Sequence, residues 1–248
     1  MLSHLVRPQQ RDPRGGWRYR CSRTPSARGA HLRALRPTRD LPARVWTADP
    51  PATGPMRVTH RDEKVRQPSV SRLYPSISYT TGTGRQAHAL DVAMEILGGS
   101  ETSWLYRALV EDQRIAVGAG ASGDTAGRGG GSVTLYATPA EGVSVEQVET
   151  AMDEVVARFL RDGPSEAEFA RAKSRLAAAA IYARDSQESL AYIYGSSLAE
   201  GETLDAIVAW PDQIEAVTRD EAMAIARETL NINASVTGLL LPPEEAAQ

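Results

Sequence analysis

Histidine and cysteine are the side chains of this 248-residue chain best suited to bind a transition metal or to act as nucleophiles. The chain has four histidines, of which only His60 and His88 follow the N-terminal stretch. No two histidines have the i, i+4 spacing that places both imidazoles on one face of a helix. Cys21 has no second cysteine with which to form a disulfide or a zinc site. The sequence therefore predicts no metal site, and a site that combines His88 with a carboxylate stays open as an alternative.

Two glycine-rich stretches have some features of phosphate-binding loops. The spacing Gly82-x-Gly84-x-x-Ala87 is that of a dinucleotide fingerprint, but residues 76–79 before it alternate polar and apolar, as a strand buried on both faces would not. Residues 127–131 precede a strand and lack the Gly-Lys-Ser/Thr ending of a phosphate loop. We interpret the two stretches as a strand-to-helix loop and a hairpin tip. The Gly-x-Ser-x-Gly serine motif is absent as well, so we expect no catalytic residue and no bound cofactor.

Charge is distributed unevenly along the chain. Residues 1–55 contain eleven Arg, no Lys, three Asp and eight of the fifteen Pro, a net charge of +8 in a chain of net charge −3. That leaves −11 for residues 56–248. Frequent proline interrupts helices and strands, and few apolar residues offset the entropy of ordering, so we interpret residues 1–55 as an irregular, disordered leader. A nucleic-acid-binding arm is the weaker alternative.

No segment has the composition of a targeting or membrane-spanning sequence. The N-terminus lacks the apolar region of about 7–15 residues that a secretory signal requires. No apolar run approaches the ~18 residues of a membrane span. We therefore predict no membrane span, and the compartment stays open.

The elements that must position any site are predicted from periodicity in residues 56–248. Two-residue alternation and apolar runs predict strands at 56–60, 70–80, 115–121, 132–138 and 234–241. Helical spacing predicts helices at 86–98, 102–113 and 187–199. Capping boxes start three more helices at Ser144, Ser165 and Thr218. Because strands follow one another as hairpins, we predict an α+β fold with an antiparallel sheet and helices packed on one face.

An acidic run lies in the helix that starts at Ser144. Its apolar side chains share one face, so the carboxylates Glu146, Glu149, Asp153 and Glu154 fall mostly on the other. We interpret this run as a solvated helix face and not as a metal site.

Five strings occur in an order that is shared with a known family: 89–99 (ALDVAMEILGG), 102–109 (TSWLYRAL), 111–116 (EDQRIA), 166–176 (EAEFARAKSRL) and 216–230 (AVTRDEAMAIARETL). They resemble the C-terminal, non-zinc-binding half of the pitrilysin/insulinase family of zinc metallopeptidases, in particular its bacterial zinc-protease-like members. Residues 41–51 resemble the linker before that half. The resemblance implies one α+β half unit at 56–248, and we hypothesise that a longer protein has lost its first half.

The resemblance also implies where the chemistry lies. In the family, two similar halves close around a peptide, and the first half binds zinc through His-x-x-Glu-His and a later Glu. This sequence contains no His-x-x-Glu-His, so no metal ligand or catalytic base is carried over and the chain is expected to be inactive alone. Zinc is expected only in a catalytic partner half.

In the better-known members, the second half supplies an Arg and a Tyr, seven residues apart, that hold the substrate. The stretch 109–113 aligns these positions with Val110 and Val117, and valine cannot donate a hydrogen bond to a peptide carbonyl. The clamp is therefore lost, or neighbours such as Arg107 or Arg114 have taken it over.

The resemblance thus implies a non-catalytic C-terminal domain or fragment. Its expected role is to complete a peptide-binding chamber with a catalytic half or a sister subunit. A degenerate structural or docking paralogue without a role in proteolysis is the alternative, and a nucleic-acid-associated protein is the weaker one.

Overall fold

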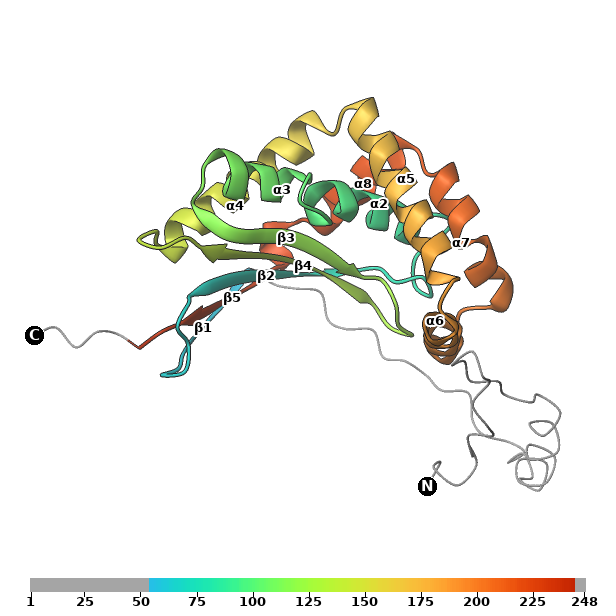
Figure 1. Cartoon of the computed structure of the whole chain (residues 1–248), viewed down its shortest axis with the longest axis horizontal. Helices are drawn as coiled ribbons and strands as arrows, with labels where there is room; N and C mark the ends of the chain where they lie inside the picture. Colours follow the sequence, from blue (N-terminus) through green and yellow to red (C-terminus); the bar gives the residue numbers. More distant parts are fainter. Residues whose placement is uncertain (1–53, 244–248) are drawn as a thin grey trace, which may run out of the picture. The chain divides into compact units, whose positions relative to one another are not determined.

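The computed structural model describes residues 54–243. The predictions for Cys21 and for most of the leader at 1–55, including its nucleic-acid alternative, lie outside the described residues. The described part contains five strands (Figure 1): β1 Met56–Arg61, β2 Ser69–Ser76, β3 Ala116–Asp124, β4 Gly131–Pro139 and β5 Val236–Leu241.

These strands form one sheet in the order β1-β5-β2-β4-β3. β2 pairs antiparallel with β4 and β5, and β3 pairs antiparallel with β4. β1 pairs parallel with β5 at the edge, and almost the whole described chain forms the long connection that such a parallel pair requires. The predicted α+β class is confirmed, with antiparallel pairing through the centre and one parallel pair at the margin.

The helices cover one face of this sheet (Figure 1). They are α2 Gln86–Gly98, α3 Trp104–Tyr106, the π-helical η2 Arg107–Asp112, α4 Val145–Asp162, α5 Glu166–Ala183, α6 Gln187–Glu200, α7 Leu204–Ala216 and α8 Arg219–Thr229. A 3₁₀ turn, η3 Ile232–Ala234, leads into β5. None of the helices in the described part is long and apolar enough to cross a membrane.

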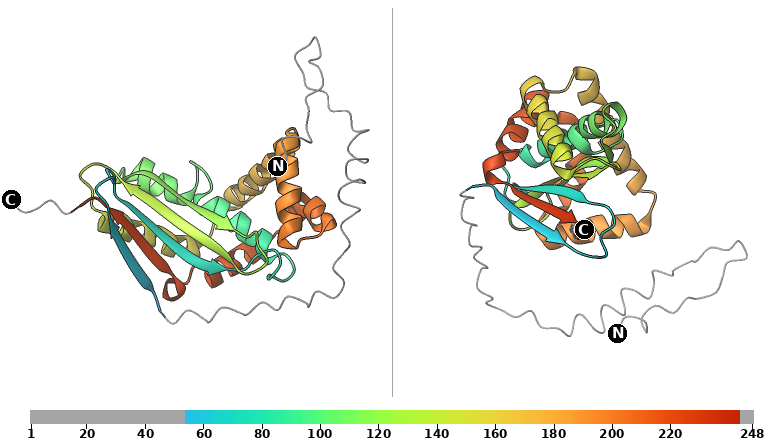
Figure 2. Two further views of the ribbon diagram at one scale, coloured as in Figure 1. Left: turned by 90° about the horizontal axis from the view of Figure 1, so that it is seen from below. Right: turned by 90° about the vertical axis from the view of Figure 1, so that its left-hand side faces the viewer.

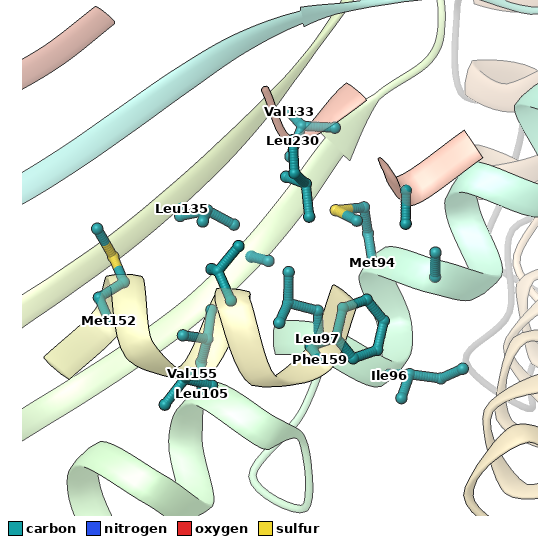
Figure 3. Packing of buried hydrophobic residues seen from close by; sticks show 14 of the residues in the cluster. Met94, Ile96, Leu97, Leu105, Val133, Leu135, Met152, Val155, Phe159 and Leu230 are labelled. Carbon is teal, nitrogen blue, oxygen red and sulfur yellow. The ribbon is translucent and has the colours of Figure 1, made fainter. Parts of the chain in front are cut away.

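The core lies between the sheet and the helices, as Figure 3 shows. Phe159 and Met152 of α4 are fully buried and share this layer with Leu97 of α2 and Leu135 of β4. Their spacing follows from the helical period, which brings every third or fourth side chain of α4 to the same face. Figure 3 shows side chains from both helices and from β4 pointing into one continuous layer.

Local sequence signals fix the ends of several helices. All three predicted capping boxes form, with the hydroxyls of Ser144, Ser165 and Thr218 accepting from the backbone three residues on. Gly98 ends α2 where the helix meets β3, and a Cβ there would lie 2.0 Å from the Ala121 nitrogen. Only glycine allows the backbones of α2 and β3 to approach this closely.

Two predictions about elements differ from the structure. The strand predicted to continue to residue 80 ends at Ser76, and Ser78 turns the chain by accepting bonds from the backbone of Thr80 and Thr81. No element was predicted at residues 204–216, where the structure has helix α7 with Pro211 inside it. Threonine is a typical N-cap residue, and the Thr203 hydroxyl caps the start of α7 by accepting from the Ala206 nitrogen.

Candidate binding surface of the sheet

The face of the sheet opposite the helices is uncovered within the described residues (Figure 2, left). Large apolar side chains on these strands are exposed to solvent, namely Met56, Val58, Leu73, Tyr136 and Leu240. Single exposed apolar residues are common on proteins, but several on one sheet face mark a binding surface. We take this face as the candidate site.

One cross-strand row shows how the face is built. Val58 lies opposite Gly238, which lies opposite Ser71, and Ser71 and Gly120 flank Tyr136 in the neighbouring pairs. A Cβ at Gly120 would lie 2.6 Å from the Tyr136 hydroxyl oxygen, so the phenol occupies the space next to this glycine. The row thus places two large apolar side chains among small residues, where another backbone can approach the sheet closely.

Val110 and Val117, the two predicted substrate-facing positions, have different surroundings. Val110 lies in η2, where it is half-buried and packs against the core. Val117 lies in β3 and is 56% exposed, beside a β-bulge between Ala116 and Gly118. A bulge rotates the side chains of a strand and often occurs next to binding sites. Only Val117 therefore offers its side chain fully to a ligand.

Arg107 and Arg114, which we suggested as donors in place of the two valines, lie at the start of η2 and just after its end. Arg107 begins η2 and is exposed. Arg114 is exposed between η2 and β3, and it has a positive φ of 56°, unlike any other non-glycine residue described. The backbone bond from Ile115 to Leu109, 3.0 Å long, closes this turn. Both guanidinium groups thus project from a fixed turn next to the strand that carries Val117.

A buried arginine lies beneath the sheet and was not predicted from the sequence. Arg72 of β2 is 2% exposed, and its Nε donates to the Thr237 hydroxyl at 2.9 Å. Its terminal nitrogens donate to Asp153 and, at 2.6 Å, to Glu149. Arg57 of β1 donates two more bonds to Glu149, of 2.9 and 2.7 Å. The network joins three strands to α4.

This network corrects the interpretation of two of the four carboxylates in the acidic run on α4. Glu149 and Asp153 are partly buried partners of arginine, whereas Glu146 and Glu154 are exposed as predicted. Hydrogen bonds from Arg57 hold the pKa of Glu149 below its ordinary value, and the charges of Arg57 and Arg72 act in the same direction. The spacing of these carboxylates along the helix is that of a solvent-exposed face. The arginines that pair with Glu149 come from strands more than 70 residues away, so the sequence pattern does not indicate them.

A second polar cluster lies between α2, α7 and the loops that follow β2 and β3. The Trp210 indole donates to the Tyr79 hydroxyl at 2.6 Å, and Tyr79 in turn donates to the carboxylate of Asp91. The buried Thr125 hydroxyl donates to the other oxygen of Asp91 at 3.0 Å. Burial raises the pKa of Asp91 to about 6, although the hydrogen bonds from Tyr79 and Thr125 act in the opposite direction. The cluster links α2, α7 and the two loops beside them.

His88 lies next to this cluster. The sequence left open a site that combines this histidine with a carboxylate. Its ring meets Tyr79 edge-on, with the ring centroids 5.0 Å apart. Burial lowers its pKa, with a smaller effect of the Arg85 charge. Within residues 54–243, no hydrogen bond joins His88 to a carboxylate, and no three His, Cys, Asp or Glu side chains are grouped to hold a metal ion.

A five-stranded sheet with helices on one face and an exposed apolar face is the α+β unit that the sequence predicted. The sequence matches the family described as the peptidase M16 inactive domain over residues 30–176, which is more than half of its length. The chain belongs to this family of domains related to zinc proteases. The predicted pitrilysin/insulinase C-terminal type is thereby confirmed. None of the curated proteins compared with the chain matches it.

Solved structures share the fold at low sequence identity. A protease from Helicobacter pylori has a TM-score of 0.79 at 17% identity, over 90% of this chain and 53% of its own. A peptidase M16 inactive domain from Pseudomonas fluorescens has a TM-score of 0.68 at 20% identity, over 92% and 52%. The periplasmic protease PqqL from Escherichia coli has a TM-score of 0.62 at 20% identity, over 77% and 21%. The chain spans about half the length of the first two.

Proposed function

We propose that this chain completes a peptide-binding chamber together with a catalytic half or a sister subunit. The observation that carries the proposal is the uncovered apolar face of the sheet, in a domain that spans about half the length of its structural relatives. A half unit that supplies an apolar wall needs a second half to enclose a peptide. The folded domain would comprise residues 56–248, preceded by the leader.

In this proposal, zinc belongs to the partner, whose His-x-x-Glu-His motif would leave one coordination position open for water. The chain's own part is to present the sheet face to an extended peptide. Arg114 and Arg107 would supply the donors that Val110 and Val117 cannot, because a guanidinium carries five N–H groups. Apolar contacts with Val58, Leu73 and Tyr136 would supply the rest of the affinity.

The test begins with the full chain, tagged and purified from its native cells under mild conditions. We expect a co-purifying protein that carries His-x-x-Glu-His and one zinc ion, and peptide hydrolysis only when both chains are present. Tyr136→Ser should then raise the KM for peptides, because it removes apolar surface from the wall. Ile232→Ser, which is equally exposed at 45% but lies in η3, is the matched control.

The alternative is a structural paralogue with no role in proteolysis, and valine at both clamp positions favours it. It predicts that the partner hydrolyses peptides equally well with and without this chain. Stoichiometric zinc or peptide hydrolysis in the purified chain alone would contradict both functions.

A further inference from the structure

The second large exposed apolar surface of the protein lies on a helical arm, which we define as residues 176–213. The arm comprises the end of α5, all of α6 and most of α7, and it extends past the end of the sheet (Figures 1 and 2). Not one residue of the arm is buried. Half of the fourteen large apolar side chains that are exposed in the described part lie on it: Ile181, Tyr182, Tyr192, Ile193, Leu198, Leu204 and Val208.

Helix α6 shows why this exposure calls for a partner. It has 14 residues, among which only Glu188 and Glu200 are charged, and it buries none of them. Isolated helices shorter than ~12–15 residues are marginal in water, and helices of globular proteins gain most of their stability from a packed apolar face. In α6, Tyr192 is instead 75% exposed.

Polar contacts, together with the part-buried side chains of Leu176 and Trp210, hold the arm to the body and leave its other large apolar side chains exposed. Arg128, from the β3–β4 connection, donates to the Ala199 carbonyl at 2.8 Å. Trp210 donates to Tyr79 at the base of α7. Ser186 caps α6 by accepting from the backbone, and Gly201 ends it with a φ of 111°. These contacts position the arm without covering it.

The charge of the arm indicates what kind of surface would cover it. Six Asp and Glu residues and a single cation, Arg184, give the arm a net charge of −5. A symmetric contact between two copies would bring two such surfaces together and would be repulsive. A cationic partner is attracted to the same surface and gains association rate as well as specificity.

We propose that the arm is the docking surface for a second protein that presents apolar side chains framed by arginine or lysine. This site is distinct from the sheet face, since its residues lie on α5, α6 and α7 and not on the strands. Binding buries Tyr192, Leu198 and Val208 and neutralises the carboxylates around them. The proposal therefore does not depend on proteolysis.

A defined probe tests the proposal with the full chain. The probe is an amphipathic helical peptide of leucine and lysine, and its control is the same peptide with glutamate in place of lysine. We expect the cationic peptide to bind and to protect residues 176–213 from hydrogen exchange, and the anionic peptide not to bind. Tyr192→Ser with Leu198→Ser should weaken binding about tenfold, as for residues at the centre of an interface. Glu188→Gln with Asp212→Asn should weaken it and reduce its salt dependence.

The matched control is Ile232→Ser in η3, an exposed apolar residue outside both the arm and the sheet face, which should leave binding unchanged. Protection of the strands instead of the arm, equal binding of both peptides, or no binding at all would overturn the proposal. Self-association that the arm substitutions abolish would also overturn it, since the occupant would then be a second copy. Far-ultraviolet circular dichroism of each variant shows whether α6 remains folded.

Discussion

Asp91 gives the folded domain a pH dependence that a single substitution can remove. Its carboxylate accepts hydrogen bonds from Tyr79 and Thr125 beneath α7 and is shielded from water. Burial raises its pKa in the folded state to about 6, against 3.8 for the ordinary group. The folded state therefore holds the proton more tightly than the unfolded state.

The sign and size of the effect follow from this difference. Stability from Asp91 is fully present below pH 3.8 and is lost as the pH rises through about 6. At 1.36 kcal/mol for each tenfold change in the proton affinity, the loss approaches about 3 kcal/mol at pH 7. Asparagine in this position cannot ionise. The stability of Asp91→Asn should therefore not fall, at this position, as the pH rises through about 6.

The assay is urea unfolding of the wild type and Asp91→Asn at intervals between pH 4 and pH 7.5. The free energy of unfolding of the variant, relative to wild type, should rise by about 2.5 kcal/mol across this range. Other carboxylates, such as Glu149, titrate equally in both proteins and cancel in the difference. A flat or falling difference for Asp91→Asn would refute the assignment of a raised pKa.

Three further predictions concern single side chains. Arg72→Met should reduce the free energy of unfolding by about 3 kcal/mol, since it leaves Glu149 half-buried without this partner, and urea unfolding at pH 7 measures it. Arg114→Gly should raise that free energy by roughly 1 kcal/mol, because glycine adopts the positive φ of 56° without strain, and it should lower hydrolysis by the reconstituted complex if Arg114 holds substrate. Thr218→Ala removes the cap of α8 and should cost about 1 kcal/mol in thermal unfolding, whereas Thr218→Ser should not.

Local signals made most of the fold predictable from the sequence. The helix predicted at 86–98 is observed with the same ends, because apolar spacing and the Gly98-Gly99 pair act within one element. The Ser144 and Ser165 capping boxes likewise depend on residues three apart. The parallel pairing of β1 with β5 could not be predicted this way, since it joins the two ends of the described chain.

The polar clusters were not predictable for the same physical reason. Arg72 has the period of a strand residue that points into the core, but whether a buried guanidinium is tolerated depends on carboxylates about 80 residues away. Asp91 and Trp210 are 119 positions apart and are linked through Tyr79. Pairings across such separations leave no periodic signal, so only the folded structure identifies them.

Val110 stabilises the fold, whereas Val117 lies on the candidate site and contributes little to the fold. Val110 packs against the core, where an aliphatic side chain is favourable whether or not a peptide is bound. Val117 is exposed beside a bulge, where folding gains little from an aliphatic group. An apolar residue there makes β3 resemble the rest of the sheet face, which carries Val58, Leu73 and Tyr136. In the function that we propose, this face would hold peptides through apolar contact, and Arg114 at the adjoining turn would supply the charge.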